Sequence, residues 1–158
     1  MSQDASGKNV VVLGLGNLLM SDEGIGVRLV QQLCRSADEF TAVDFVDAGT
    51  GGFTILHRIQ GKGKAIVIDC ACMGEPPGTI KKFTPSEVVS TRTITDLSSH
   101  GADLLGIIDL ACQIDQCPDE IIIFGIEPQV VKPGCELSKI LADKFDEYVT
   151  MIRRELED

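Results

Sequence analysis

The sequence lacks an apolar run long enough to cross a membrane, and it is poor in basic residues. No stretch approaches the roughly 18 apolar residues of a membrane span. The run Val10–Leu15 is too short for the core of a signal peptide, and Gly14, Gly16 and Asn17 interrupt it. Against 24 acidic residues stand 14 lysine and arginine residues, which gives a net charge of −10. We therefore predict a cytoplasmic protein that binds neither nucleic acid nor an anionic membrane, because both select basic surfaces.

Common catalytic and metal-binding templates are also missing. The chain contains no G-x-S-x-G elbow, no H-E-x-x-H helix and no Walker A lysine. The six cysteines are expected to be reduced thiols, mostly buried as small apolar side chains. Cys70-Ala71-Cys72 is too tightly spaced for a zinc knuckle, and Cys112 with Cys117 has no matching second pair. Asp47-Ala48-Gly49-Thr50 resembles the D-[ST]-G loop of aspartic proteases only loosely.

The glycine-rich stretch near the start of the chain departs from a dinucleotide-binding fingerprint. The third glycine of G-x-G-x-x-G would fall at position 19, which is Leu19. Asp22 and Glu23 stand where a helix N-terminus would receive a pyrophosphate, and two carboxylates repel an anion and favour a cation. These residues therefore argue against a nucleotide-binding Rossmann-like protein, which we keep as an alternative function.

Hydrophobic periodicity predicts alternating strands and helices, which is typical of an α/β fold. We predict one domain over residues 1–158, with residues 1–8 flexible, built on a mostly parallel twisted sheet of about five strands with helices on both faces. The longest stretch without a clear prediction is Thr84–Leu97. The predicted strands are Asn9–Leu15, Thr41–Val46, Lys64–Cys70, Thr79–Phe83 and Glu120–Ile126, and the predicted helices are Glu23–Arg35, Thr50–Ile59, His100–Gln113 and Glu136–Leu156.

Three polar residues are candidates for a functional site. Asp22 is expected to cap the first helix, which leaves Glu23 without a capping role because one carboxylate suffices. Asp69 ends a buried strand, and in open α/β sheets ligands bind beyond the carboxyl ends of the strands. At the first turn of its helix, His100 should be neutral, as a metal ligand must be. The alternatives are a local turn for Asp69 and structural roles for His100 and His57.

Several short motifs follow one another along nearly the whole chain in the order typical of one family. Each motif alone is weak, but the ordered set closely resembles the nickel-iron hydrogenase maturation proteases. The motifs are Gly14-Leu15-Gly16-Asn17, Ser21-Asp22-Glu23-Gly24-Ile25-Gly26, Asp47-Ala48-Gly49-Thr50, Val67-Ile68-Asp69, Pro77-Gly78-Thr79, Ser98-Ser99-His100 and Gly125-Ile126-Glu127-Pro128.

The resemblance implies a monomeric aspartyl protease that trims the C-terminal extension of the nickel-loaded hydrogenase large-subunit precursor. It also implies that Glu23, Asp69 and His100 recognise the nickel, which belongs to the precursor, so that no stored cofactor is needed. Asp69 would be catalytic, either as the general base for a water or beside a nickel ion that polarises the scissile carbonyl. The main alternative is a nickel chaperone or checkpoint protein that binds the precursor without cutting it.

One segment departs from the family pattern, because Asp69 is followed here by Cys70-Ala71-Cys72-Met73. We expect these side chains to pack in the core. The alternative is that a soft ligand beside the site adds affinity for a metal ion such as nickel.

Overall fold

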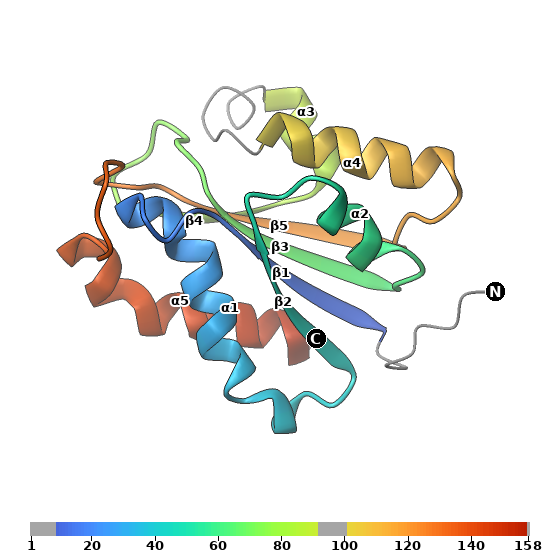
Figure 1. Cartoon of the computed structure of the whole chain (residues 1–158), viewed down its shortest axis with the longest axis horizontal. Coiled ribbons are helices and arrows are strands. Elements are labelled where there is room, and N and C mark those ends of the chain that lie inside the picture. Colours follow the sequence, from blue (N-terminus) through green and yellow to red (C-terminus); the bar gives the residue numbers. More distant parts are fainter. Residues whose placement is uncertain (1–8, 92–100, 158) are drawn as a thin grey trace.

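The strands form one sheet in which four neighbours are parallel and the edge strand β4 runs antiparallel. The computed structural model describes residues 9–91 and 101–157 (Figure 1). Within these residues the sheet has five strands in the order β2-β1-β3-β5-β4. The strands are β1 (Val10–Leu15), β2 (Val43–Gly49), β3 (Lys64–Cys70), β4 (Ile80–Phe83) and β5 (Glu120–Ile126), and the helices are α1 (Ile25–Cys34), α2 (Phe53–Ile59), α3 (Pro85–Thr91), α4 (Gly101–Gln113) and α5 (Lys139–Glu157), with 3-10 turns η1 (Ser21–Gly24) and η2 (Ala37–Glu39).

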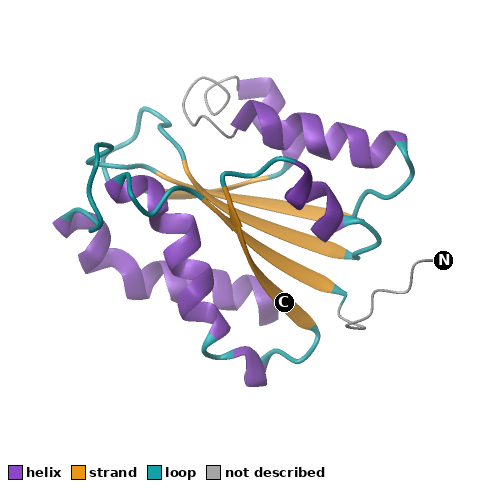
Figure 2. Ribbon diagram, viewed as in Figure 1, coloured by secondary structure: helices purple, strands orange, loops and turns teal. Residues whose placement is uncertain are grey.

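Helices cover both faces of the sheet, as Figure 2 shows. Alternate residues of β1 point to opposite faces, so that Val11 and Leu13 pack under α2, α3 and α4, whereas Val12 packs under α1 and α5. Strands buried on both faces read as continuous apolar runs, which explains why β1, β3 and β5 were visible in the sequence. The predicted fold class is confirmed. Residues 1–8, predicted to be flexible, lie outside the described residues.

Helix α3 lies within Thr84–Leu97, the stretch for which the sequence gives no clear prediction. Thr84 precedes it, and the hydroxyl of Thr84 donates to Glu87 Oε1 at 3.1 Å. Pro85 takes the first helical position, where its missing N–H costs nothing. The pattern Thr84-Pro85-Ser86-Glu87 thus has the spacing of a capping box, a signal that the sequence analysis missed. Val88 of this helix is buried in the core.

The first helix rests directly on the strand ends because glycine allows backbones to touch. A Cβ atom on Gly26 would lie 2.2 Å from the carbonyl oxygen of Ile68 and 2.4 Å from that of Leu15. A Cβ atom on Gly14 would lie 2.3 Å from the carbonyl oxygen of Gly26. The start of α1 and the preceding turn η1 therefore sit against the carboxyl ends of β1 and β3.

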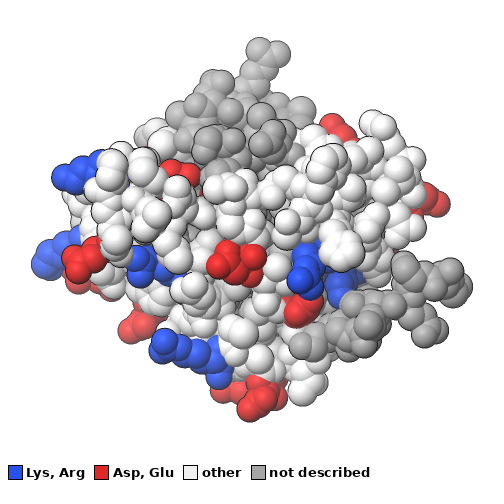
Figure 3. All heavy atoms as spheres, viewed as in Figure 1, with Lys and Arg blue, Asp and Glu red and all other residues white. Residues whose placement is uncertain are grey.

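Charged residues on the face shown in Figure 3 are dispersed, and the described residues there form no continuous basic patch. Within residues 9–91 and 101–157, no helix combines the length and the apolar character that crossing a bilayer requires.

A buried ion pair ties α5 to the sheet. Glu155 is 9% exposed, and its two carboxylate oxygens accept from Lys64 Nζ and Lys82 Nζ, each at 3.0 Å. Burial alone would raise the pKa of Glu155, but the hydrogen bonds and charges of these two lysines outweigh it and lower that pKa below its ordinary value.

We expect Glu155→Gln to lower the free energy of unfolding at pH 7 by about 2 kcal/mol, because charge-assisted hydrogen bonds are lost. A lowered pKa means that this stabilisation is complete above the pKa of the unfolded chain and disappears as pH falls through the folded pKa. The difference between variant and wild type should therefore shrink below about pH 4. Urea unfolding at several pH values measures it, with the exposed Glu157→Gln as control. A difference that does not change with pH would contradict this assignment.

Candidate active site

The candidate site lies at the carboxyl edge of the sheet, where β1, β3 and β5 end side by side. Asp69 is the penultimate residue of β3 and lies opposite Gly125 of β5. It is only 5% exposed, so its carboxylate is buried and does not lie on a surface turn. The reason is that β3 continues to Cys70, and helices α3 and α4 cover that end of the strand.

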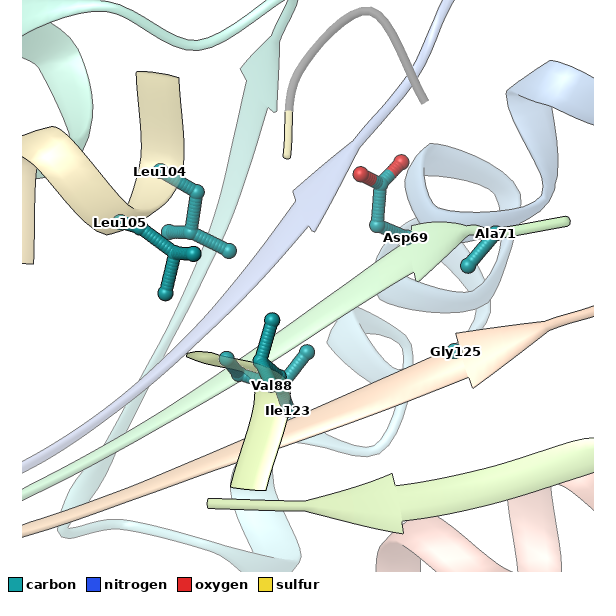
Figure 4. Close-up of a pocket in the computed structure, with 7 residues that line it drawn as sticks. All are labelled: Asp69, Ala71, Val88, Leu104, Leu105, Ile123 and Gly125. Atoms are coloured by element: carbon teal, nitrogen blue, oxygen red, sulfur yellow. The ribbon is translucent and has the colours of Figure 1, made fainter. Parts of the chain in front are cut away.

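Asp69 contributes the one carboxylate among the described residues that line an otherwise apolar pocket. Figure 4 shows Asp69 at the end of β3 with its carboxylate directed away from Gly125. The lining residues come from β3, β5, α3, α4 and the segment after β3, and they are Asp69, Ala71, Val88, Leu104, Leu105, Ile123 and Gly125. An apolar wall strengthens the electrostatic interactions of a carboxylate, because less water screens it.

Glu23 reaches the same edge from the 3-10 turn η1. The predicted helix Glu23–Arg35 therefore begins two residues later, at Ile25, and Glu23 is half-buried in the tighter turn. A Cβ atom on Gly16 would lie 2.0 Å from the Glu23 carbonyl oxygen, and Gly16 has a φ of +142°. Glycine at position 16 is thus needed for the loop after β1 to lie against the turn that carries Glu23.

Negative charge is concentrated at this edge. Burial raises the pKa of the Cys70 thiol, and the charges of Asp69, Cys72, Glu23 and Asp22 raise it further. The structure thus brings Glu23 and Asp69 together around Cys70, in a region that favours a cation. A thiol whose pKa is raised is a poor metal ligand at neutral pH, so packing is the favoured interpretation of Cys70.

The third predicted ligand, His100, lies outside the described residues, as do Ser98 and Ser99. Among the residues that are described, no three histidine, cysteine, aspartate or glutamate side chains form a group that could hold a metal ion. The described part of the site therefore supplies two carboxylates, Glu23 and Asp69, and no complete metal centre.

Asp22 does not cap the first helix, so that prediction is wrong. Neither η1 nor α1 has a side-chain cap, and Asp22 is fully buried. Its Oδ2 accepts from the N–H groups of Gln129 at 2.9 Å and Val130 at 2.8 Å, and its Oδ1 accepts from Ser138 N–H at 2.7 Å. A buried carboxylate must be hydrogen-bonded, and here all the donors come from a segment more than 100 residues away.

Glu127 is another buried carboxylate, and the sequence indicates no separate role for it. It is 6% exposed, and its Oε1 accepts from Met73 N–H at 2.6 Å and Glu75 N–H at 2.9 Å. These amides belong to the loop that leaves β3 after Cys70, the neighbour of Asp69. The available signal was its place directly after β5, at the same edge of the sheet as Asp69.

Comparison with known proteins identifies the family of this chain. A family model described as hydrogenase maturation protease matches residues 27–155. The chain belongs to the hydrogenase maturation protease family. It is 32% identical over 123 residues to the hydrogenase expression/formation protein HupD of Thiocapsa roseopersicina, a match that covers 78% of this chain and 56% of that protein. It is 28% identical over 130 residues to the hydrogenase 2 maturation protease of Escherichia coli, covering 82% of this chain and 79% of that one.

The fold of this family member is also shared with a solved structure. The hydrogenase maturating endopeptidase HybD from E. coli superposes with a TM-score of 0.81 at 25% identity, over 94% of this chain and 92% of that chain. The resemblance inferred from the ordered motifs is therefore confirmed. The family member spans little more than half the length of the HupD protein that it matches.

Proposed function

We propose that this chain is an endopeptidase that removes the C-terminal extension of a nickel-loaded hydrogenase large-subunit precursor. Family membership supports the hydrolytic activity, and the relatives named above include a maturation protease and a maturating endopeptidase. The observation that carries the proposal is the pair of carboxylates, Glu23 and Asp69, at one edge of the sheet. The same proposal has the enzyme act as a monomer in the cytoplasm.

In this proposal Glu23, Asp69 and His100 are the ligands that recognise the nickel of the precursor. Two carboxylates and one neutral imidazole suit a borderline divalent ion and leave coordination positions for the thiolates that already hold it. The nickel is then part of the substrate, so the enzyme stores no cofactor. The concentration of negative charge around Cys70 supports this role.

Hydrolysis of the scissile peptide needs a base for the attacking water and an electrophile for the carbonyl oxygen. We assign Asp69 as the general base, because its carboxylate lies in an apolar pocket where few other acceptors compete for the water proton. Nickel recognised beside it would supply the electrophile. Cleavage would then depend on the metal through the chemistry as well as through recognition.

The test is to incubate the chain with the precursor prepared with and without nickel, and to follow loss of the tail by mass spectrometry. We expect removal of the tail from the nickel-loaded precursor alone. Tight binding of the loaded precursor without cleavage would instead support the chaperone or checkpoint alternative. A nucleotide thermal-shift screen tests the Rossmann-like alternative, for which we expect no shift.

We expect the protein to be purified without stoichiometric nickel and to bind added nickel weakly. The site has few ligands of its own, and the remaining ones come from the precursor. Glu23→Gln and Asp69→Asn should each weaken binding by roughly tenfold or more, whereas Asp44→Asn, in β2, should not. Metal analysis followed by calorimetric titration checks this. One metal per chain that survives a strong chelator would point to a resident catalytic metal.

A further inference from the structure

Residues 127–138, the β5–α5 connector, join two segments of the candidate site that are distant in the sequence. The connector starts at Glu127, directly after β5, and ends at Ser138, directly before α5. Two buried carboxylates, Asp22 and Glu127, each link this connector to a segment that carries one of the candidate acids. Asp22 reaches the connector from the turn that carries Glu23, and Glu127 reaches from the connector to the loop after Asp69.

The turn that carries Glu23 is fastened to the connector by more than Asp22. Ser21 N–H donates to the Gly134 carbonyl at 3.0 Å, and the Ser21 hydroxyl donates to the Lys132 carbonyl at 2.8 Å. Asp22 N–H donates to the Val130 carbonyl at 3.0 Å. The backbone and the side chain of Asp22 therefore both bind Val130 of the connector. The turn η1 is therefore held to the connector by hydrogen bonds from two consecutive residues.

The segment that follows Asp69 is fastened to the other end of the connector. Ala71 N–H donates to the Ile126 carbonyl at 2.9 Å, which continues the β3–β5 ladder past the end of the strands. Gly78 N–H donates to the Glu127 carbonyl at 2.8 Å, and Glu127 N–H donates to the Thr79 carbonyl at 2.8 Å. Together with the two hydrogen bonds to Glu127 Oε1, these bonds attach the loop after β3 to Glu127 through both its backbone and its side chain.

We propose that Asp22 and Glu127 are positioning residues that act through the β5–α5 connector to hold Glu23 and Asp69 in one mutual geometry. The inference rests on the proposed function, because it concerns the same two acids. Both are buried carboxylates satisfied by backbone N–H groups, so removing the acceptor leaves buried donors unpaired and releases the segment that it holds.

Asp22→Asn is the sharper test, because Asp22 uses both of its oxygens. Asparagine offers one acceptor and would direct an NH2 group at an N–H donor, so either the Ser138 bond or the pair from Gln129 and Val130 is lost. We expect kcat for tail removal to fall on the order of 100-fold, as for a displacement of about 1 Å at reacting groups. KM for the nickel-loaded precursor should rise as well, because Glu23 is one of the proposed nickel ligands. Hydrogen exchange at these amides should rise at the same time.

Glu127 allows a conservative rescue, because both of its hydrogen bonds go to Oε1. Glu127→Gln keeps that oxygen and should retain most of the activity, whereas Glu127→Leu should lose it to the same extent as Asp22→Asn. If Asp22→Asn does not fold, this pair of variants still tests the inference. Equal activity of the glutamine and leucine variants would overturn it.

Glu155→Gln is the control for destabilisation as such. Glu155 is also a buried carboxylate with charged partners, yet it makes no hydrogen bond to the connector. It should lower stability and leave kcat per folded molecule unchanged. If Asp22→Asn behaves in the same way, the positioning role is wrong. If the wild-type chain does not cleave at all, the proposed function fails. The positioning role is then tested by the nickel affinity of the isolated protein. An affinity that is unchanged in Asp22→Asn and Glu127→Leu would overturn that role.

Discussion

Asp69→Asn is expected to reduce tail removal by about 10²–10⁴-fold, the contribution typical of a general base. Asparagine has nearly the same shape as aspartate, so the pocket between β3, β5, α3 and α4 should stay packed. The amide cannot accept a proton from water at neutral pH, and it is a weaker ligand for a divalent ion. Single-turnover cleavage of the nickel-loaded precursor measures the effect at saturating enzyme.

The matched control is Asp44→Asn, which makes the same chemical change in β2 at a half-exposed aspartate paired with Arg58. It should leave cleavage at the wild-type rate. Thermal unfolding of both variants shows whether the fold is kept, since a loss of about 1 kcal/mol would shift the midpoint by only roughly 2–4 °C. Cleavage by Asp69→Asn at the wild-type rate would remove Asp69 from the catalytic step.

The structure does not support Asp22 as a substitute for Glu23. Although Asp22 is adjacent in sequence, its carboxylate is fully buried and binds three backbone N–H groups of the connector. Breaking those bonds to reach a metal ion would leave buried donors unpaired. Loss of the Glu23 carboxylate therefore has no replacement from this neighbour.

Gly26→Ala is expected to be strongly disruptive, because it adds a methyl group where helix α1 touches the strand ends. The new Cβ atom would lie 2.2 Å from the Ile68 carbonyl oxygen and 2.4 Å from that of Leu15, and backbone atoms cannot rotate out of the way. Helix α1 must then lift from the ends of β1 and β3. We expect a loss of about 3 kcal/mol or more in the free energy of unfolding, together with loss of cleavage, because the turn carrying Glu23 moves with the helix.

Gly106→Ala is the control for that change, because Gly106 is an exposed position within α4 where a Cβ atom meets nothing within 4 Å. There the same substitution should stabilise the protein by roughly 0.5–1 kcal/mol, since alanine loses less entropy in a helix. Urea unfolding compares the two variants directly. If Gly26→Ala were as stable as Gly106→Ala, the close packing of α1 on the sheet would not be required.

Much of the fold was predictable from local patterns. The apolar runs of β1, β3 and β5 and the glycine-rich turn after β1 are properties of neighbouring residues, so they are visible without a tertiary structure. The capping pattern that starts α3 was also present and was missed. The ordered motifs were sufficient to indicate the family, and the rule that strand ends carry sites was sufficient to single out Asp69.

By itself the sequence determined the order of strands and helices, the family and the candidate acids, because those depend on spacing along the chain. Only the tertiary structure decided where each acid lies and which groups surround it. Asp22 and Glu23 are neighbours with the same charge, yet one is buried against the amides of Gln129, Val130 and Ser138 and the other is half-buried at the sheet edge. Which carboxylate finds amide donors depends on contacts between segments more than 100 residues apart. No local pattern contains that information, because chain folding alone brings those donors to the acid.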